Sequence, residues 1–118
     1  MHEISITQDI IDSVITKLKN YKVNKVNSIK LQIGLLTALD PDSLKFSFDT
    51  LIDNTILKEA RLIIEKIPLT IVCLNCNSES KVTKFDYICP ICKDINIKTY
   101  NGNELNIIDM EVEIDEDN

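Results

Sequence analysis

Residues 73–76 read Cys-Leu-Asn-Cys and, after twelve further residues, residues 89–92 read Cys-Pro-Ile-Cys. These two motifs contain all four cysteines of the 118-residue chain. Each motif reverses the chain tightly, so its two sulfur atoms converge on one point. Four thiolates placed in this way close a tetrahedron around one metal ion, with metal–sulfur distances of about 2.3 Å for zinc. The stretch therefore predicts a small metal-held domain, and the rest of the chain is placed around it.

Three other uses of the cysteines are open. Disulfides require an oxidising compartment, whereas the sequence has no secretory signal. A thioredoxin-like redox centre uses one Cys-x-x-Cys pair at the start of a helix, not two matched pairs. Iron is the third, because thiolate tetrahedra accept both metals. The second motif resembles a rubredoxin knuckle, although Asn77 and Lys93 stand where rubredoxin knuckles carry glycine.

Zinc is the metal that we expect here, and we expect its role to be structural. A closed four-thiolate site leaves no coordination position for a substrate. In so short a segment, metal binding supplies most of the folding free energy, on the order of 10 kcal/mol at neutral pH. The expected zinc ligands are Cys73, Cys76, Cys89 and Cys92.

Composition limits the function classes. With 44% hydrophobic residues and only two glycines, the chain suits one compact domain plus a small metal-held one. A net charge of −6 argues against binding nucleic acid, which requires a basic face. The longest largely apolar run, Ile67 to Leu74, is too short to span a bilayer. Without a signal segment, we expect the protein in the cytoplasm and not at a membrane.

Hydrophobic periodicity predicts helices and strands on both sides of the cysteines. Residues 4–20 read as an amphipathic helix, and residues 26–33 alternate as a strand with one exposed face. Asp40 and Pro41 open a second helix, as its cap and its first residue. The apolar stripe of the first helix contains Ile4, Ile11, Val14, Ile15 and Leu18, and that of the second contains Leu44, Phe48, Leu51 and Ile52.

The second half of the chain is predicted to form strands before and after the cysteine motifs. A strand over residues 60–67 leads to the cysteines, and residues 95–100 form a short strand after them. Asn101-Gly102 predicts a hairpin turn, because both residues readily take positive φ. The return strand, residues 104–114, is long enough to join the strands at 26–33 and 60–67. Between the motifs, we expect Val82, Phe85, Tyr87 and Ile88 to pack against the metal-bound core.

The predicted fold class is α+β. It has a three-stranded, mainly antiparallel sheet with two helices, plus an inserted zinc-ribbon domain. The expected domains are a discontinuous α/β domain, residues 1–68 and 104–118, and a zinc-ribbon domain, residues 69–103. A second metal site is expected in the α/β domain, at the opposite end of the chain from the cysteines.

The only histidine is residue 2. The Met1 amine, the His2 amide nitrogen and the His2 imidazole can close two fused chelate rings around one ion. Glu3 can supply a fourth ligand. Such an in-plane set suits square-planar Ni(II) or Cu(II). From its position alone, His2 can also be an exposed residue at a terminus that binds no metal.

Met1-His2-Glu3 before an amphipathic helix, with a C-x-x-C…C-P-x-C ribbon late in the chain, resembles the HypA/HybF family. These proteins deliver nickel during [NiFe]-hydrogenase maturation. Further matches are Asn54-Thr55, Glu59-Ala60-Arg61-Leu62, Pro68 and Asn101-Gly102-Asn103-Glu104-Leu105, so the resemblance covers essentially the whole chain. Family members often carry glycine where this chain has Lys93, so the last turn can differ.

The resemblance implies a metallochaperone and not an enzyme. It implies that His2 is the essential nickel ligand, completed by Met1 and Glu3, and that the four cysteines hold zinc. Asp40 is a secondary nickel candidate, since its place before Pro41 is already explained by helix capping. The implied partners are the nickel-handling GTPase HypB and the [NiFe]-hydrogenase large subunit. Urease is a further implied target in some organisms. The sequence is compatible with either a monomer or a homodimer.

Three rival functions are open from the residues alone. A zinc-ribbon adapter would bind another protein and have an inert terminus. A rubredoxin-like electron carrier would be red when purified without added metal. A nucleic-acid ribbon is disfavoured by the charge, and no nucleophile–base pair or phosphate loop indicates catalysis.

Overall fold

The computed structural model describes the backbone of residues 2–114 and the side chains of residues 4–114. Met1, residues 115–118 and the side chains of His2 and Glu3 therefore lie outside the described residues. The elements are α1 (His2–Leu18), β1 (Val23–Gly34), the 3-10 turn η1 (Leu35–Thr37), α2 (Pro41–Leu51), β2 (Arg61–Ile67), β3 (Leu69–Cys73), β4 (Glu79–Val82), β5 (Ile97–Thr99) and β6 (Leu105–Ile114).

The chain divides into two compact units. The first contains residues 1–31, 39–64 and 107–118, and the second contains residues 32–38 and 65–106. Strands β1, β2 and β6 each contribute residues to both units.

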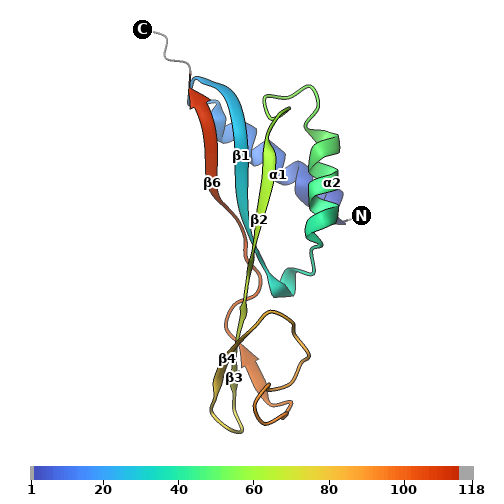
Figure 1. Ribbon diagram of the computed structural model, residues 1–118, viewed down its shortest axis with the longest axis vertical. Coiled ribbons are helices and arrows are strands. Elements are labelled where there is room, and N and C mark those ends of the chain that lie inside the picture. Colours follow the sequence, from blue (N-terminus) through green and yellow to red (C-terminus); the bar gives the residue numbers. More distant parts are fainter. Residues whose placement is uncertain (1, 115–118) are drawn as a thin grey trace. The chain divides into compact units, whose positions relative to one another are not determined.

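The larger sheet has the strand order β2-β1-β6. Strands β1 and β2 run in the same direction and β6 runs in the opposite direction (Figure 1). A parallel pair needs a crossover connection, and α2 supplies it between β1 and β2. The expected fold class is confirmed, with two helices and mixed or antiparallel three-stranded sheets.

The core of the first unit is aliphatic, as the composition predicts. Helices α1 and α2 pack against each other. In β1, Ile29 and Leu31 are buried and alternate with polar residues as expected. Other buried members of this core are Thr7, Ile10, Ile11, Val14, Leu18, Val26, Leu44, Phe48, Ile52 and Leu57.

Helix α1 begins earlier than its periodicity predicts. The helix starts at His2 instead of Ile4, and the Ile4 side chain is 54% exposed. The predicted stripe is wrong at Ile4, whereas Ile11, Val14 and Leu18 are buried as expected. Thr7 and Ile10 are buried instead, so the buried face of the first turns is rotated from the predicted one.

The start of α2 agrees with the sequence. Asp40 is the N-cap, and its side chain accepts a hydrogen bond from the Ser43 amide at 3.3 Å. The Ser43 hydroxyl donates to the same carboxylate oxygen at 2.9 Å. Pro41 follows as the first helical residue, where its missing N–H costs nothing.

The smaller sheet has the order β4-β3-β5, and both of its pairings are antiparallel. In its register, Leu69 is opposite Val82 and Ile71 is opposite both Ser80 and Thr99. Strand β4 is a finding that periodicity did not predict, because Glu79–Val82 is short and mostly polar. Leu69, Ile71, Cys73 and Cys89 are the buried residues at its centre.

The predicted hairpin at Asn101-Gly102 is wrong. Strand β5 pairs with β3, whereas β6 neighbours β1 in the other sheet, so β5 and β6 do not pair. Gly102 has φ +124°, but Asn101 does not take positive φ. The Asn101 side chain instead binds the start of β3: it accepts from the Thr70 amide at 2.7 Å and donates to the Pro68 carbonyl at 2.9 Å.

The two glycines of the protein allow two segments of the second unit to approach closely. The Gly34 amide donates to the Glu104 carbonyl, and the Leu36 amide donates to the Gly102 carbonyl, both at 2.8 Å. A Cβ on Gly34 would collide with the Gly102 backbone and the Glu104 carboxylate. The segment after β1 therefore lies against the segment before β6, backbone to backbone.

Within the described residues, no helix has both the length and the apolar character needed to cross a bilayer.

Candidate metal centre

The four cysteines predicted to bind metal lie together. Their sulfur atoms are all within 4.8 Å of one another. The Cys73–Cys92 sulfur pair is 3.5 Å apart and the Cys76–Cys89 pair is 3.7 Å apart. A tetrahedron with metal–sulfur bonds of about 2.3 Å has sulfur–sulfur edges of about 3.8 Å. The spacing of the four sulfur atoms therefore suits one metal ion at their centre.

The first knuckle is formed by hydrogen bonds that the chain makes to its own sulfur atom. The amides of Asn75 and Cys76 donate to the Cys73 sulfur at 3.3 and 3.4 Å. The Cys73 amide donates to the Ser78 carbonyl, and the Asn77 amide donates to the Cys73 carbonyl, both at 2.9 Å. The turn thus aims two amide dipoles at one thiolate.

The second knuckle repeats these bonds. The amides of Ile91 and Cys92 donate to the Cys89 sulfur at 3.3 and 3.4 Å. The Cys89 amide donates to the Asp94 carbonyl at 2.8 Å, and the Lys93 amide donates to the Cys89 carbonyl at 2.9 Å. The cluster therefore consists of two equivalent halves, each with one buried and one exposed cysteine.

Left-handed backbone closes both turns. Asn77 has φ 62° and Lys93 has φ 66°. These are the two positions at which rubredoxin-type knuckles carry glycine. The knuckle conformation is thus retained at Lys93, although a lysine there bears the steric cost that glycine avoids. The departure from the family pattern leaves the turn geometry intact.

Ser78 and Asn75 extend the cluster beyond its four ligands. The Ser78 hydroxyl is 3.0 Å from the Cys76 sulfur and 3.6 Å from the Cys89 sulfur. The Asn75 side-chain amide donates to the Cys92 sulfur at 3.6 Å. Sequence reasoning missed both residues. Their polar side chains directly beside ligand cysteines are the one signal that could have indicated them.

The environments of the thiols differ. The Cys76 amide favours the thiolate of Cys73, but burial and the adjoining sulfur atoms of Cys92 and Cys76 outweigh it and raise the Cys73 pKa to about 11. The Ser78 hydroxyl holds the pKa of the Cys76 thiol below its ordinary value. The Cys92 amide, assisted by the Ser78 hydroxyl and the Ile91 amide, lowers the pKa of Cys89 to about 6 despite burial.

These shifts in thiol pKa are consistent with a cation-binding site. Some thiols are already stabilised as anions by directed N–H and O–H groups, and the crowded sulfur atoms make full ionisation costly without a positive charge among them. A divalent ion supplies that charge. The donor set and its size therefore fit a tetrahedral thiolate metal, with all four positions taken by protein.

The residues between the knuckles pack less closely than predicted. Val82, Phe85 and Ile88 are half-buried, but Tyr87 is 70% exposed and has φ 65°. Its ring contacts that of Phe85, with the ring centres 4.3 Å apart and the ring planes tilted by 38°. The expectation that Tyr87 packs against the metal-bound core is therefore wrong, because its left-handed backbone directs the side chain to solvent.

Of the predicted nickel ligands, only the Asp40 side chain lies within the described residues, and it caps α2. Met1 and the side chains of His2 and Glu3 lie outside them. The backbone of His2 and Glu3 forms the first residues of α1.

Comparison with known proteins identifies the family. Residues 1–112 match the family described as "Hydrogenase/urease nickel incorporation, metallochaperone, hypA". The chain is 33% identical over 125 residues to the hydrogenase maturation factor HypA of Methanococcus maripaludis strain C7, with 99% of each chain covered. It is 36% identical over 113 residues to that of Desulfatibacillum aliphaticivorans, which covers 95% of this chain and 87% of the relative.

Solved structures share the fold. The solution structure of the Ni metallochaperone HypA from Helicobacter pylori superposes with a TM-score of 0.64 at 23% identity, covering 96% of this chain and 98% of that one. A second solution structure of a HypA protein has a TM-score of 0.65 at 25% identity, covering 95% and 96%.

The match over residues 1–112 and the identity to full-length relatives confirm the expected resemblance. The four-cysteine cluster agrees with the metal-binding part of it. The chain belongs to the HypA family of nickel metallochaperones, which are maturation factors and not enzymes.

Proposed function

We propose that this chain binds Ni(II) at its N-terminus and delivers the ion to [NiFe]-hydrogenase during maturation, while zinc at the four cysteines holds the ribbon. The observation that carries the proposal is the match to a nickel-incorporation family, which begins at residue 1. The proposed nickel ligands are the Met1 amine, His2 and Glu3.

The start of α1 at His2 supports this ligand set. The first four N–H groups of an α-helix have no partner within the helix. The amides of His2 and Glu3 belong to this first turn. A metal ion can therefore take an amide nitrogen there without breaking an intrahelical hydrogen bond. The resulting in-plane nitrogens suit square-planar nickel.

Asp40 is a weaker candidate ligand. Its carboxylate already accepts hydrogen bonds from the amide and the hydroxyl of Ser43. Asp40→Asn keeps the capping oxygen and removes the charge, so it separates the two roles. If Asp40 binds nickel, this variant weakens nickel affinity while the helix content stays the same.

The proposed partners and location follow from the delivery of nickel. Nickel would be received from or shared with the nickel-handling GTPase HypB and passed to the [NiFe]-hydrogenase large subunit in the cytoplasm, with urease as a second target. Copper binds such sites more tightly than nickel, so selectivity must come from metal supply and from docking to these partners.

Calorimetric nickel titration of the untagged, zinc-loaded protein tests the proposal. We compare the wild type with His2→Ala and with a variant carrying one extra residue before Met1, because each removes one part of the chelate. Both changes should abolish a single tight site. If all three proteins bind nickel alike, the N-terminal site is wrong and a zinc-ribbon adapter becomes the better interpretation.

Nickel affinity should also depend on pH. The His2 imidazole and the Met1 amine must be deprotonated to bind, so protons compete with nickel as the pH falls. We expect affinity to fall steeply between pH 7.5 and pH 5, through the imidazole range. An affinity that stays flat over this interval would argue against His2 as a ligand.

Metal analysis of protein purified without added metal tests the zinc assignment. We expect one zinc per chain in the wild type, and loss of that zinc in Cys89→Ser. One iron per chain with a red colour would instead indicate a rubredoxin-like centre. Asp42→Asn, which changes a carboxylate outside the cluster, is the matched control.

A further inference from the structure

Strand β6 forms one edge of the larger sheet. The strand order β2-β1-β6 places β1 on one side of it, and no strand of the described residues lies on the other side (Figure 1). An edge strand presents unpaired N–H and C=O groups that can pair with another chain. Over its ten residues β6 contains neither proline nor lysine, two common devices that protect an edge.

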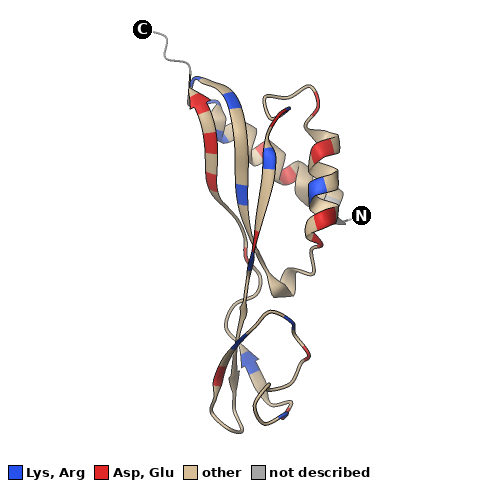
Figure 2. Cartoon of the chain, viewed as in Figure 1, with Lys and Arg blue, Asp and Glu red and all other residues tan. Residues whose placement is uncertain are grey.

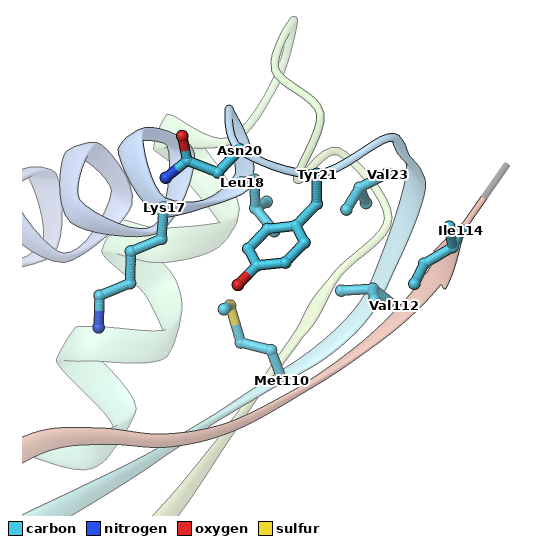
Figure 3. Close-up of a pocket in the computed structure, with 8 residues that line it drawn as sticks. All are labelled: Lys17, Leu18, Asn20, Tyr21, Val23, Met110, Val112 and Ile114. Atoms are coloured by element: carbon cyan, nitrogen blue, oxygen red, sulfur yellow. The ribbon is translucent and has the colours of Figure 1, made fainter.

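The helix-facing side of β6 is apolar and open. Met110, Val112 and Ile114 line a pocket of about 390 Å³ together with Leu18, Tyr21 and Val23, and the polar residues Lys17 and Asn20 complete its lining. Figure 3 shows Met110 and Val112 projecting from β6 toward the Tyr21 ring. Tyr21 is 66% exposed and Ile114 is 57% exposed, so this apolar surface remains accessible to a ligand.

The opposite side of β6 is acidic. Asp109, Glu111 and Glu113 alternate with the apolar residues and therefore share the other face, where Figure 2 shows the acidic positions spaced along the strand. Among the described residues, no hydrogen bond or ion pair engages these three carboxylates. By contrast, Glu59 in the same unit pairs with Lys25 at 3.5 Å.

The charges on the two edge strands indicate which kind of strand can bind at β6. A second copy of β6 laid antiparallel on this edge would bring carboxylates close to carboxylates, and like charges across strands are destabilising. A strand that alternates lysine or arginine with apolar residues complements both faces. The other edge of the sheet, β2, carries Arg61 and Lys66 against a single carboxylate, Glu65, and therefore complements a basic strand less well than β6 does.

We propose that β6 is a docking edge for an extended segment of a partner protein in which basic residues alternate with apolar ones. The segment adds as a fourth strand through backbone hydrogen bonds. Its apolar side chains cover Met110, Val112 and Tyr21, and its basic side chains meet Asp109, Glu111 and Glu113. This site does not depend on nickel binding, because none of its residues is a proposed metal ligand.

The test uses a capped ten-residue peptide that alternates lysine and valine, titrated into the zinc-loaded protein at 0.15 M salt. Binding is followed by fluorescence anisotropy, and its location by amide chemical shifts. We expect saturable binding with shifts concentrated in residues 107–114. A peptide that alternates glutamate and valine should not bind. Shifts spread over the whole surface would overturn the proposal.

Two N-methylated peptides test the backbone pairing. In a strand, the N–H groups of alternate residues point to the same edge. Methylating every lysine amide, or instead every valine amide, blocks one edge of the peptide and leaves the other free. One methylated peptide should lose binding and the other should keep it. Equal binding of the two would show that no strand pairing occurs.

Glu111→Lys and Glu79→Lys form a matched pair of variants. Both reverse one exposed glutamate on an edge strand and change the net charge equally, but Glu79 lies in β4 of the smaller sheet. Glu111→Lys should weaken peptide binding about fivefold or more, and Glu79→Lys less than twofold. If both variants lose the same peptide affinity, the effect comes from net charge alone and the proposal is wrong. The proposal is also wrong if sedimentation shows a dimer that the peptide cannot dissociate.

Discussion

Each cysteine knuckle ends in a residue with left-handed backbone, Asn77 in the first and Lys93 in the second. Asparagine tolerates this conformation, whereas lysine brings its Cβ close to a carbonyl oxygen at a cost of about 1–2 kcal/mol. The two amide–sulfur bonds and the metal hold the turn in place despite that cost. The second knuckle therefore stores strain that the first largely avoids.

Lys93→Gly should consequently stabilise the zinc-loaded protein. Relief of the left-handed penalty exceeds the extra chain entropy of glycine, about 0.5–1 kcal/mol, so a net gain of up to about 1 kcal/mol is expected. Chemical denaturation of the zinc-loaded form measures it. Lys81→Gly, in extended strand β4, is the control and should lose about 0.5–1 kcal/mol. Equal destabilisation by both changes would contradict the strain at Lys93.

Ser78 offers a second test at the residue scale. Its hydroxyl lies 3.0 Å from the Cys76 sulfur and favours the thiolate, so Ser78→Ala should raise the pKa of Cys76. Zinc affinity should then fall about tenfold, as for other partners of metal ligands. Protons compete more strongly for a thiol of higher pKa, so the loss should be larger at pH 6 than at pH 9.

Competition with a chromogenic chelator measures these affinities. Ser80→Ala is the control: it removes the same hydroxyl group two residues later, within β4, and should leave zinc affinity unaltered. A Ser78→Ala loss that is the same at both pH values would mean that the hydroxyl does not act through thiol ionisation.

At the scale of elements, the sequence predicted what is local and periodic. The spacing within each motif was sufficient to pair Cys73 with Cys76 and Cys89 with Cys92, because a Cys-x-x-Cys turn needs no distant contact to form. Asp40 before Pro41 likewise located the start of α2. The Asn101-Gly102 hairpin failed because long-range pairing decided the outcome: β5 pairs with β3, and β6 neighbours β1. Strand β4 was missed for the same reason, since pairing with β3 outweighs its weak intrinsic pattern.

The close approach of Gly34 to Gly102 could not be inferred from sequence either, and it predicts two different responses to alanine. Gly34→Ala places a methyl group against the Gly102 backbone, which cannot move aside, so a loss of at least about 2 kcal/mol is expected. Gly102→Ala meets only side-chain atoms of Leu36, the nearest at 2.5 Å, but also strains the backbone at φ +124°. Urea unfolding measures both losses.

Adding Leu36→Ala to each variant separates the two causes. It should recover part of the loss caused by Gly102→Ala, because the side-chain collision disappears while the backbone strain remains. It should recover nothing in Gly34→Ala. Recovery of similar size in both double variants would show that the two glycines do not differ in this way.

At the scale of the whole molecule, hydrophobic burial is unequal between the two units. The first unit contains most of the buried aliphatic side chains, from Ile10 in α1 to Leu62 in β2. The second unit buries few large apolar residues besides Ile33, Leu69 and Ile71. A core that small does not offset the chain entropy of about fifty residues without a metal or a disulfide. Metal binding is thus coupled to folding in one unit and much less in the other.

Removal of zinc should accordingly unfold the second unit alone. After treatment with a strong chelator under reducing conditions, amide protection should be lost across residues 69–100 but kept in α1, α2 and the middle of β1. Helical circular dichroism at about 222 nm should change little, because both helices belong to the first unit. Added zinc should restore the protection. Loss of the helical signal together with the ribbon amides would mean that the two units fold as one, and that zinc stabilises the end of the chain that we propose binds nickel.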